Sequence, residues 1–417
     1  MSSVRGPLRV AFLTHYFPPE IGAPQARIFE LARRLSRGGD DVTVLTGFPN
    51  YPTGVVHEGY RGRFAMEENM DGVRVIRRWI FATPNAGFAK RILNHLSFAL
   101  SSLTAWRALG PVDVLIVESP PLFTGLAALA LSRLKRAPFI FNVSDVWPQS
   151  AVELGMLRQP TAIRIAEALE WHLYERAARV TVPTAGILEG LVARGLPRRK
   201  VFHLTNGVDV DIYQPGARDS ALAESLGSEF GASGRKLFVY AGTHGLAQGL
   251  DVILEAARAT RNPEVLYVLV GEGADKDALM RKAREQRIDN VVFLPNQPKA
   301  SMPGLLNLAY AALITLKPLD VFRSALPTKM FEAMAAGRPI IASVSGEAAD
   351  VVLAAGCGLV TEPGDPVAFR NAVEALASDP DRAREMGLRG REHAVEHFDR
   401  RAIVAQLREL LRTTVAA

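Results

Sequence analysis

LPTKMFEAMAAGRP, residues 326–339, is the most informative segment of this 417-residue chain. Pro327 suits the first position of a helix, and Gly337 suits the position just past its end. A helix start carries free N–H groups and positive partial charge, so it attracts phosphate. Lys329 and Glu332 are three residues apart and can share one helix face, the Lys to bind a diphosphate and the Glu to accept bonds from ribose hydroxyls. An ordinary surface Lys–Glu pair would fit the same pattern.

Short apolar runs alternate with helical periodicity on both sides of this segment. Such alternation predicts parallel sheets with helices on both faces, and the length favours two large domains. We therefore expect an α/β chain with two Rossmann-like, doubly wound parallel-sheet domains that face each other across a cleft. The expected strands are residues 8–14, 41–46, 73–77, 112–117, 139–143, 179–182, 236–241, 264–270, 290–294, 311–316, 339–343 and 358–360.

The alternation breaks at NGVDVDIYQPG, residues 206–216, which we interpret as a linker. We therefore place the N-terminal domain at residues 1–207 and the C-terminal domain at residues 208–397. In open α/β sheets, ligands bind beyond the carboxyl ends of the strands, so the loops after the strands are the candidate sites.

In the second half, Gly242 and Thr243 follow the strand at 236–241. Glycine lets the backbone approach a phosphate, and the hydroxyl can donate a hydrogen bond. Gly271 and Gly273 follow the next strand and either line a nucleotide base or form a plain turn.

In the first half, Gly22 and Ala23 precede a helical segment, where small residues would admit a phosphate. Arg27, inside that segment, can reach an anion or be solvated. His15 has a protonatable ring, although a lone His is more often structural. Asp145 follows the strand at 139–143, where it orients an acceptor hydroxyl or caps the next turn.

Composition disfavours several classes of protein. Cys357 is the only cysteine, so neither an internal disulfide nor a cysteine-based metal site is possible. The net charge of +6 is spread along the chain, which disfavours a nucleic-acid binder.

The first residues do not resemble a signal peptide, and the apolar run 92–109 is too interrupted for a spanning helix. The basic, amphipathic region 90–109 either contacts an anionic membrane surface or packs on the core.

The ordered motifs resemble family 4 glycosyltransferases. The resemblance is carried by residues 206–209, 242–249 and 271–273 and above all by PTKMFEAMAAGRP at 327–339. HYFPPEIGA at 15–23, with DVWP at 145–148, resembles the WbuB-type branch, which is associated with bacterial surface polysaccharides and aminosugar transfer.

This resemblance implies a GT-B fold, a nucleotide-diphosphate sugar donor that is most often UDP-linked, and retention of anomeric configuration without a metal or other cofactor. It implies that the helix at about 400–413, within residues 398–417, crosses back onto the first domain. The expected catalytic residues are Lys329, Asp145 and His15. The expected donor-binding residues are Glu332, Gly22, Ala23, Gly242, Thr243, Gly271, Gly273, Pro327, Thr328 and Arg323.

Four positions depart from the family pattern. Ser324 stands where many members have Glu, and Ser144 where many have His. Thr243 and Gln248 replace an Arg and a Lys that many members carry around the Gly242 turn. Lys329, Arg323 and Lys317 are then the candidate cations for the diphosphate, and no protein nucleophile is expected.

We therefore predict a cytoplasmic glycosyltransferase, peripheral to the inner face of the membrane. It moves a sugar, with N-acetylamino sugars among the candidates, to a saccharide, lipid-linked or small-molecule acceptor. Two alternatives stay open: a UDP-sugar 2-epimerase of the same fold, and a non-catalytic nucleotide- or glycan-binding protein.

Overall fold

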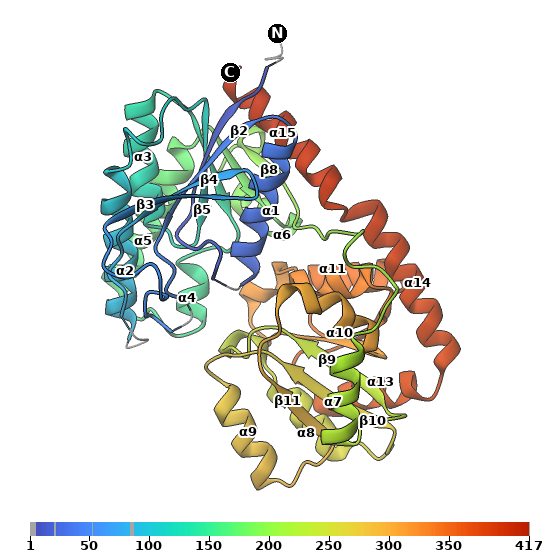
Figure 1. Ribbon diagram of the computed structural model, residues 1–417. Coiled ribbons are helices and arrows are strands. Elements are labelled where there is room, and N and C mark those ends of the chain that lie inside the picture. Colours follow the sequence, from blue (N-terminus) through green and yellow to red (C-terminus); the bar gives the residue numbers. More distant parts are fainter. Residues whose placement is uncertain (1–5, 21, 52, 84–86, 417) are drawn as a thin grey trace. The chain divides into compact units, whose positions relative to one another are not determined.

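The computed structural model describes residues 6–20, 22–51, 53–83 and 87–416, and the chain forms two compact units (Figure 1). Unit 1 comprises residues 1–205 and 403–417, and unit 2 comprises residues 206–402. The division at 205/206 lies two residues before the expected domain boundary.

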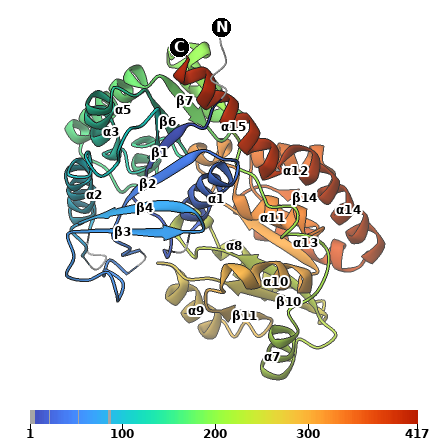
Figure 2. The ribbon, with the colours of Figure 1, turned by 45° about the horizontal axis from the view of Figure 1, so that its top comes forward.

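Unit 1 is built on an eight-stranded sheet of order β3-β4-β2-β1-β5-β6-β7-β8, in which only β3 runs antiparallel to its neighbour. Figure 2 shows β3 at the sheet edge beside β4. The strand prediction missed β3, whose residues alternate between exposed and half-buried, and β8, which has three residues. The strands are β1 Arg9–Leu13, β2 Asp41–Gly47, β3 Ala65–Met70, β4 Val73–Arg78, β5 Val114–Ser119, β6 Phe139–Val143, β7 Arg179–Val182 and β8 Val201–His203.

Helices cover both faces of this sheet, because alternate residues of its buried strands point to opposite sides. Ala11 and Leu13 of β1 pack in the core with α2, α3, α5 and α6, whereas Val10 and Phe12 pack in the core with α1. The helices of unit 1 are α1 Ala23–Arg37, α2 Phe88–Leu103, α3 Thr124–Lys135, α4 Gln149–Glu153, α5 Pro160–Arg176 and α6 Ala185–Ala193, with a short 3₁₀ turn, η1, at Arg198–Lys200.

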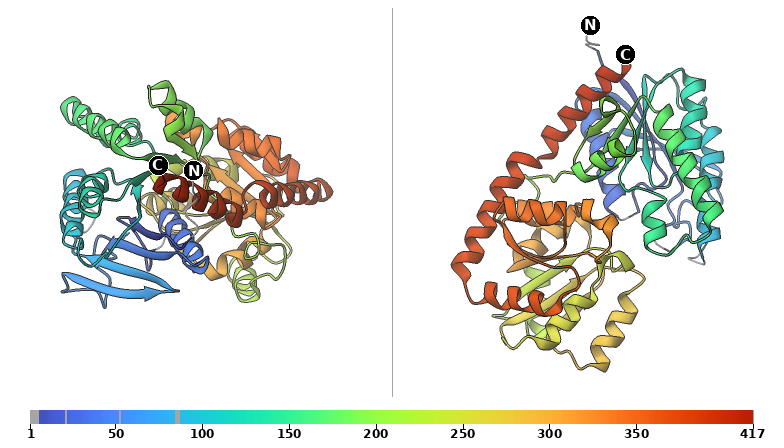
Figure 3. Two further views of the ribbon diagram at one scale, coloured as in Figure 1. Left: turned by 90° about the horizontal axis from the view of Figure 1, so that it is seen from above. Right: turned by 180° about the vertical axis from the view of Figure 1, so that it is seen from behind.

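The C-terminal helix α15, Arg400–Val415, contributes most of its length to unit 1. Its residues Leu407 and Leu411 join the core that contains α1, and Arg408 Nε lies 2.9 Å from Asp40 Oδ2. Figure 3 shows this red helix beside the blue α1. Apolar burial and an ion pair thus attach the end of the chain to the first sheet.

Unit 2 has a six-stranded, all-parallel sheet of order β11-β10-β9-β12-β13-β14. Its strands are β9 Lys236–Ala241, β10 Val265–Val270, β11 Val291–Leu294, β12 Ala311–Thr315, β13 Ile340–Ser343 and β14 Gly358–Thr361. Its helices are α7 Ser220–Phe230, α8 Asp251–Ala259, α9 Lys276–Glu285, α10 Met302–Leu308, α11 Thr328–Ala335, α12 Glu347–Ala354, α13 Pro366–Ala377 and α14 Pro380–His397, with 3₁₀ turns η2 Leu246–Gln248, η3 Lys299–Ser301 and η4 Asp320–Ser324.

The helix expected at residues 327–336 is α11. It begins at Thr328, so Pro327 is the capping residue rather than the first helical residue, a shift of one position. Pro327 has no N–H to lose in either position, and its carbonyl accepts from Met330 N at 3.0 Å. Gly337 follows the helix with a φ of 67°, which confirms its expected role.

Candidate functional site

The candidate donor site lies at the carboxyl edge of the unit 2 sheet. The strand order reverses between β9 and β12, and such a reversal opens a ligand crevice in doubly wound sheets. The Gly-rich turn 242–249 follows β9, whereas η4 and α11 follow β12. The fold therefore brings Lys329 to this turn, 81 residues along the chain from Gln248.

Neutral groups hold the ammonium of Lys329. Its Nζ lies 2.6 Å from Tyr240 Oη and 2.9 Å from Gln248 Oε1, and 3.9 Å from the centroid of the Tyr240 ring. Tyr240 Oη in turn donates to the carbonyl of Thr243 at 2.8 Å. Among the described residues, no carboxylate forms an ion pair with Lys329, so its charge is not neutralised by the chain.

Burial lowers the pKa of Lys329 to about 7, and the negative charge of Glu332 opposes this shift. Near pH 7 the amine is therefore balanced between its neutral and charged forms. An anion placed beside it favours the charged form, because opposite charges stabilise each other. The arrangement suits the binding of a diphosphate coupled to uptake of a proton.

Glu332 lies one turn further along α11 and is half-buried. Burial raises its pKa, while a hydrogen bond from Tyr213 and the charges of Arg400, Lys299 and Lys329 lower it. A carboxylate at this position can accept hydrogen bonds from two neighbouring hydroxyls of a ribose.

The loops after β9 and β10 pack backbone against backbone. A Cβ on Gly271, whose φ is 146°, would lie 1.9 Å from the carbonyl oxygen of Gly242, and one on Gly273 would lie 2.3 Å from that of His244. Gly242 N already donates to Val270 O at 2.9 Å. Gly271 and Gly273 therefore allow the two loops to pack closely against each other. Gly242 has no free N–H group to donate, so it can only let a phosphate come close to the backbone. Thr243 is exposed beside them.

The remaining donor-site residues flank the start of α11. Pro327 and Thr328 are half-buried in its first turn, which no side chain caps. The first N–H groups of an uncapped helix have no intrahelical partner. Arg323 is exposed in η4, and Lys317 N donates to Ala247 O at 3.0 Å, which places that lysine beside the Gly-rich turn.

In unit 1, Arg27 is neither solvated nor open to an external anion. It is 8% exposed, and its guanidinium donates to Glu118 Oε2 at 3.4 Å, to Ser144 Oγ at 3.3 Å and to Asn142 Oδ1 at 3.0 Å. Burial raises the pKa of Glu118, and Arg27 opposes that shift. Arg27 therefore reaches an anion, but this anion is the carboxylate of Glu118 within the chain and the solvated alternative is wrong. Its partners lie on β5, β6 and the loop after β6, which local spacing does not reveal.

His15 is enclosed in an aromatic cluster after β1. It is 1% exposed, and its Nε2 lies 2.8 Å from Asn94 Oδ1 of α2. Its ring packs against Tyr16, His95 and Phe98. Burial holds the pKa of His15 well below its usual value. The ring is therefore neutral near pH 7, and a catalytic role for it stays a prediction.

Asp145 and Gly22 lie at the starts of other helices of unit 1. Asp145 Oδ2 accepts from Ser150 Oγ of α4 at 2.8 Å, and burial raises its pKa. Pro148 is the N-cap of α4 and no side chain caps this helix, so both interpretations of Asp145 stay predictions. Gly22 caps α1, and a Cβ there would lie 2.4 Å from the Gln25 side chain. The side chain of Ala23 lies outside the described part of the chain.

The comparisons with known proteins agree with this architecture. A family model for the Glycosyl transferase 4-like domain matches residues 22–207, and one for Glycosyl transferases group 1 matches residues 227–393. The mannosyltransferase named as GDP-mannose-dependent alpha-(1-6)-phosphatidylinositol monomannoside mannosyltransferase, from Mycolicibacterium smegmatis, is 30% identical over 67% of this chain and 79% of its own length. The chain belongs to the family 4 glycosyltransferases.

Two further proteins are similar to this glycosyltransferase. The putative colanic acid biosynthesis glycosyl transferase WcaI of Escherichia coli is 26% identical over 77% of this chain and 79% of its own length. The crystal structure of Anabaena HepE in complex with UDP-glucose has a TM-score of 0.72 at 17% identity and covers 97% of this chain and 99% of HepE. This likeness shows the shared GT-B fold.

Neither Tyr240 nor His244 was predicted from the sequence as part of the site, and Gln248 was noted only as a departure from the family pattern. His244 is fully buried beside Tyr240, and burial lowers its pKa to about 4. The only signal in the sequence was the position of these residues at the end of β9 and in its Gly-rich turn.

Two searches of the described residues gave negative results. No group of three or more His, Cys, Asp or Glu side chains there is arranged to hold a metal ion. None of the helices in the same part of the chain is both long and apolar enough to cross a bilayer. The independence of the reaction from metal stays a prediction.

Proposed function

We propose that this glycosyltransferase transfers a sugar from a UDP-linked donor, with retention of configuration and without a metal, to a saccharide or lipid-linked acceptor. The observation that carries the proposal is the un-neutralised ammonium of Lys329, held by Tyr240 and Gln248 at the strand-order reversal. The UDP-glucose bound to HepE supports a uridine nucleotide as the donor, whereas the mycobacterial relative is named for GDP-mannose.

The chemical task is to stabilise the negative charge that grows on the diphosphate as its bond to the anomeric carbon breaks. Lys329 and the free N–H groups at the start of α11 would supply this stabilisation. In the proposed front-face reaction, the acceptor oxygen bonds to the anomeric carbon on the side from which the diphosphate leaves. A diphosphate oxygen takes the acceptor proton, and the nucleoside diphosphate departs. No protein nucleophile takes part.

The experiment that tests the proposal is a thermal-shift screen with UDP, GDP and their sugars, followed by product analysis with the best donor. A true donor at 100 times its Kd should add about 2.7 kcal/mol of stability. NMR of the product should show the anomeric configuration of the donor. Release of a free, epimerised sugar from donor alone would favour the epimerase, and binding without turnover on any acceptor would favour a binding protein.

We also propose that the enzyme contacts the cytoplasmic face of an anionic membrane through α2. Leu93 is 49% exposed and Leu100 is 69% exposed, and their spacing of seven residues places them on one helix face. Lys90 and Arg91 are exposed near the start of the same helix. Cationic and apolar groups together suit an interfacial helix.

Liposome flotation tests this contact. A Leu93→Asp/Leu100→Asp variant should lose binding to anionic vesicles. A matched Leu353→Asp/Leu388→Asp variant, which changes two leucines of unit 2 that are 61% and 55% exposed, should keep it. Ile92 and Leu96 are half-buried, so they are poorer test positions. Equal flotation of the two variants would remove α2 from the proposal.

A further inference from the structure

The carboxylate of Glu332 on α11 is contacted by a side chain from outside the sheet of unit 2. Burial raises the pKa of Glu332, whereas a hydrogen bond that the hydroxyl of Tyr213 donates to the carboxylate lowers it. Tyr213 lies within residues 206–216, at the start of unit 2. It is 3% exposed and belongs to the core that contains Met330 and Phe331 of α11. The ring therefore has a fixed place beside this helix, from which its hydroxyl can orient the carboxylate.

The backbone of Tyr213 is anchored to the same helix. Arg391 of α14 donates from Nη1 to Tyr213 O and to Ala335 O, each at 2.7 Å. Ala335 is the last residue of α11, so one guanidinium joins the segment that carries Tyr213 to the helix that carries Glu332. A tyrosine held in this way by ring and backbone loses little conformational entropy when its hydroxyl binds the carboxylate.

The hydrogen bond from Tyr213 serves two needs of a carboxylate that accepts from a ribose. An ionised carboxylate has about four acceptor positions, and one donor bound to it fixes its rotation while leaving positions for two neighbouring hydroxyls. Burial alone favours the protonated form, which offers fewer acceptors, whereas a donated hydrogen bond favours the ionised form. The charges of Arg400 and Lys299 act in the same direction as this bond.

We propose that Tyr213 is a positioning residue for the donor nucleotide. Its hydroxyl orients the carboxylate of Glu332 and so sets the preference of the site for ribose over 2′-deoxyribose. The inference rests on the proposed function, because it requires that Glu332 accepts hydrogen bonds from the ribose of the donor. Tyr213 acts through Glu332 and does not itself contact the nucleotide. Residues 206–216, which the sequence indicates as a linker, thus also support the donor site.

The test is calorimetric titration of the full chain with UDP, 2′-deoxy-UDP and inorganic diphosphate, or with the guanosine pair if the thermal-shift screen selects GDP. The wild type should bind UDP about tenfold more tightly than 2′-deoxy-UDP, because the deoxy sugar lacks a hydroxyl that can bond to Glu332. In Tyr213→Phe this ratio should fall about threefold to fivefold, since the carboxylate is no longer oriented. Affinity for inorganic diphosphate, which has no ribose, should stay unchanged, and the retained ring should maintain the thermal midpoint.

The pH profile of UDP binding gives a second readout that a purely structural role would not change. Loss of the hydrogen bond from Tyr213 raises the pKa of Glu332, because burial then acts with less opposition. On acidification, UDP affinity of Tyr213→Phe should therefore begin to fall at a higher pH than that of the wild type. Glu332→Gln should remove both the ribose preference and this dependence, and Tyr213→Phe should then add no further change.

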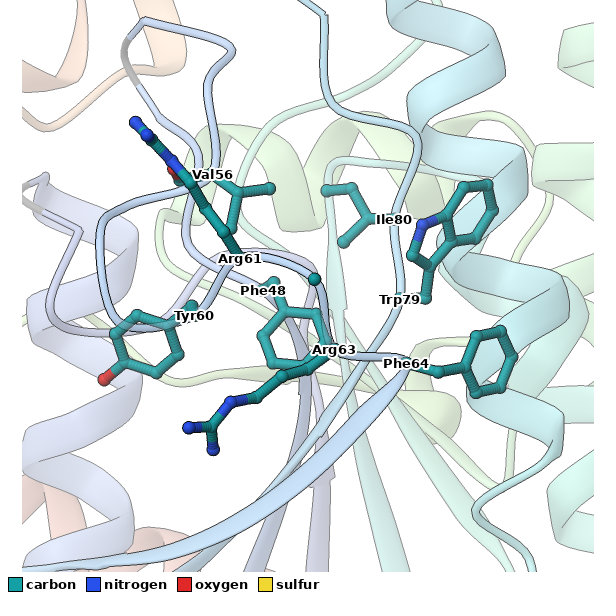
Figure 4. Close-up of a pocket in the computed structure, with 9 residues that line it drawn as sticks. Phe48, Val56, Tyr60, Arg61, Arg63, Phe64, Trp79 and Ile80 are labelled. Atoms are coloured by element: carbon teal, nitrogen blue, oxygen red, sulfur yellow. The ribbon is translucent and has the colours of Figure 1, made fainter.

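Tyr60→Phe in unit 1 is the matched control. Tyr60 lines a cavity of about 450 Å³ (Figure 4), and its hydroxyl also donates to a glutamate, Glu68, at 3.3 Å from Oε2. Glu68 keeps its ion pair with Arg77 when that hydroxyl is removed. None of these three residues is a predicted donor residue, so the UDP to 2′-deoxy-UDP ratio of Tyr60→Phe should equal that of the wild type.

An unchanged ratio in Tyr213→Phe, or an equal loss of affinity for UDP, 2′-deoxy-UDP and inorganic diphosphate, would overturn the inference while the proposed function stands. A wild-type ratio in Glu332→Gln would overturn the ribose assignment of Glu332 and the inference with it, although donor binding remains. If the wild type binds no nucleotide in the thermal-shift screen, the proposed function itself fails together with the inference.

Discussion

Arg27 of unit 1 and Lys329 of unit 2 are both cations in the first turns of a helix, and the structure treats them in opposite ways. Arg27 is bonded to the buried carboxylate of Glu118 and to two neutral side chains. Lys329 is bonded only to the neutral oxygens of Tyr240 and Gln248. A cation that its own chain has neutralised stabilises the fold, whereas one held by dipoles keeps its charge available for a ligand.

Gln248, which stands where many family members have a lysine, explains why Lys329 has only neutral partners. A lysine at this position, as in many family members, would place a second ammonium close to Lys329. Here the amide oxygen of Gln248 accepts from Lys329 Nζ at 2.9 Å instead. Lys329 thus pairs with a neutral amide at a position where many family members carry a cation.

The largest expected effect is on stability. Arg27→Met leaves Glu118 buried without its cation, and removing one partner of a buried ion pair costs about 3–5 kcal/mol. Because all four Trp residues lie in unit 1, tryptophan fluorescence during urea unfolding reports on that unit. Arg37→Met, at an exposed position of the same helix, should change stability by less than about 0.5 kcal/mol. Equal midpoints for the two variants would show that the Arg27 contacts are not stabilising.

Lys329→Ala should have the next largest effect, on catalysis. In the proposed reaction, the change removes the cation that would face the leaving diphosphate, so kcat/KM should fall by about 10²–10³ while the thermal midpoint is maintained. Lys282→Ala, which breaks a surface pair with Asp251, is the control in the same unit. Normal donor affinity and turnover in Lys329→Ala would contradict the site.

The pKa of Lys329 predicts a dependence of donor binding on pH. The folded-state pKa of about 7 lies below the usual 10.5, so the free site loses its charge as pH rises above 7, whereas bound diphosphate restores it. Affinity for UDP-glucose should therefore fall by up to about tenfold per pH unit between pH 7 and 9. Lys329→Arg, which stays charged, should give a flat profile by calorimetry. A falling profile in Lys329→Arg would assign the proton to another group.

The same shift affects stability with the opposite trend. Between pH 7 and 10.5 the unfolded chain binds the Lys329 proton and the folded chain does not, so this group adds stability as pH rises through that window. Comparison of urea midpoints for the wild type and Lys329→Met across the window checks the sign.

The smallest expected effect concerns Tyr240. Tyr240→Phe removes the hydroxyl that positions Lys329 Nζ, and the loss of one hydrogen bond should lower kcat/KM about fivefold. Tyr267→Phe is the matched control. Tyr267 is as buried as Tyr240, but its hydroxyl contacts Thr260 and not Lys329. Tyr240→Phe should also shift the pH profile of donor binding, whereas Tyr267→Phe should not. Identical profiles would reduce Tyr240 to a structural role.

Local patterns in the sequence determined the architecture. Apolar strands, helical periodicity and the Gly and Pro residues around α11 were sufficient for two parallel-sheet units, because strand and helix periods depend on residues close in sequence. The prediction failed at β3 and β8, where an exposed edge or a length of three residues leaves little pattern. Lys329 and Glu332 were predicted together because one helix carries both, and their roles stay predictions.

Only the tertiary structure decided which charged groups are neutralised. Arg27 and Glu118 are 91 residues apart, and Lys329 lies 89 residues from Tyr240. The order of the strands in each sheet brings these partners together, and this order cannot be predicted from the spacing of residues close in sequence. The same holds for the cavity of unit 1, whose wall combines segments that follow β2 and β4 and precede β3. Burial and pairing of a charge depend on everything packed around it, so its availability to a ligand is a property of the folded chain.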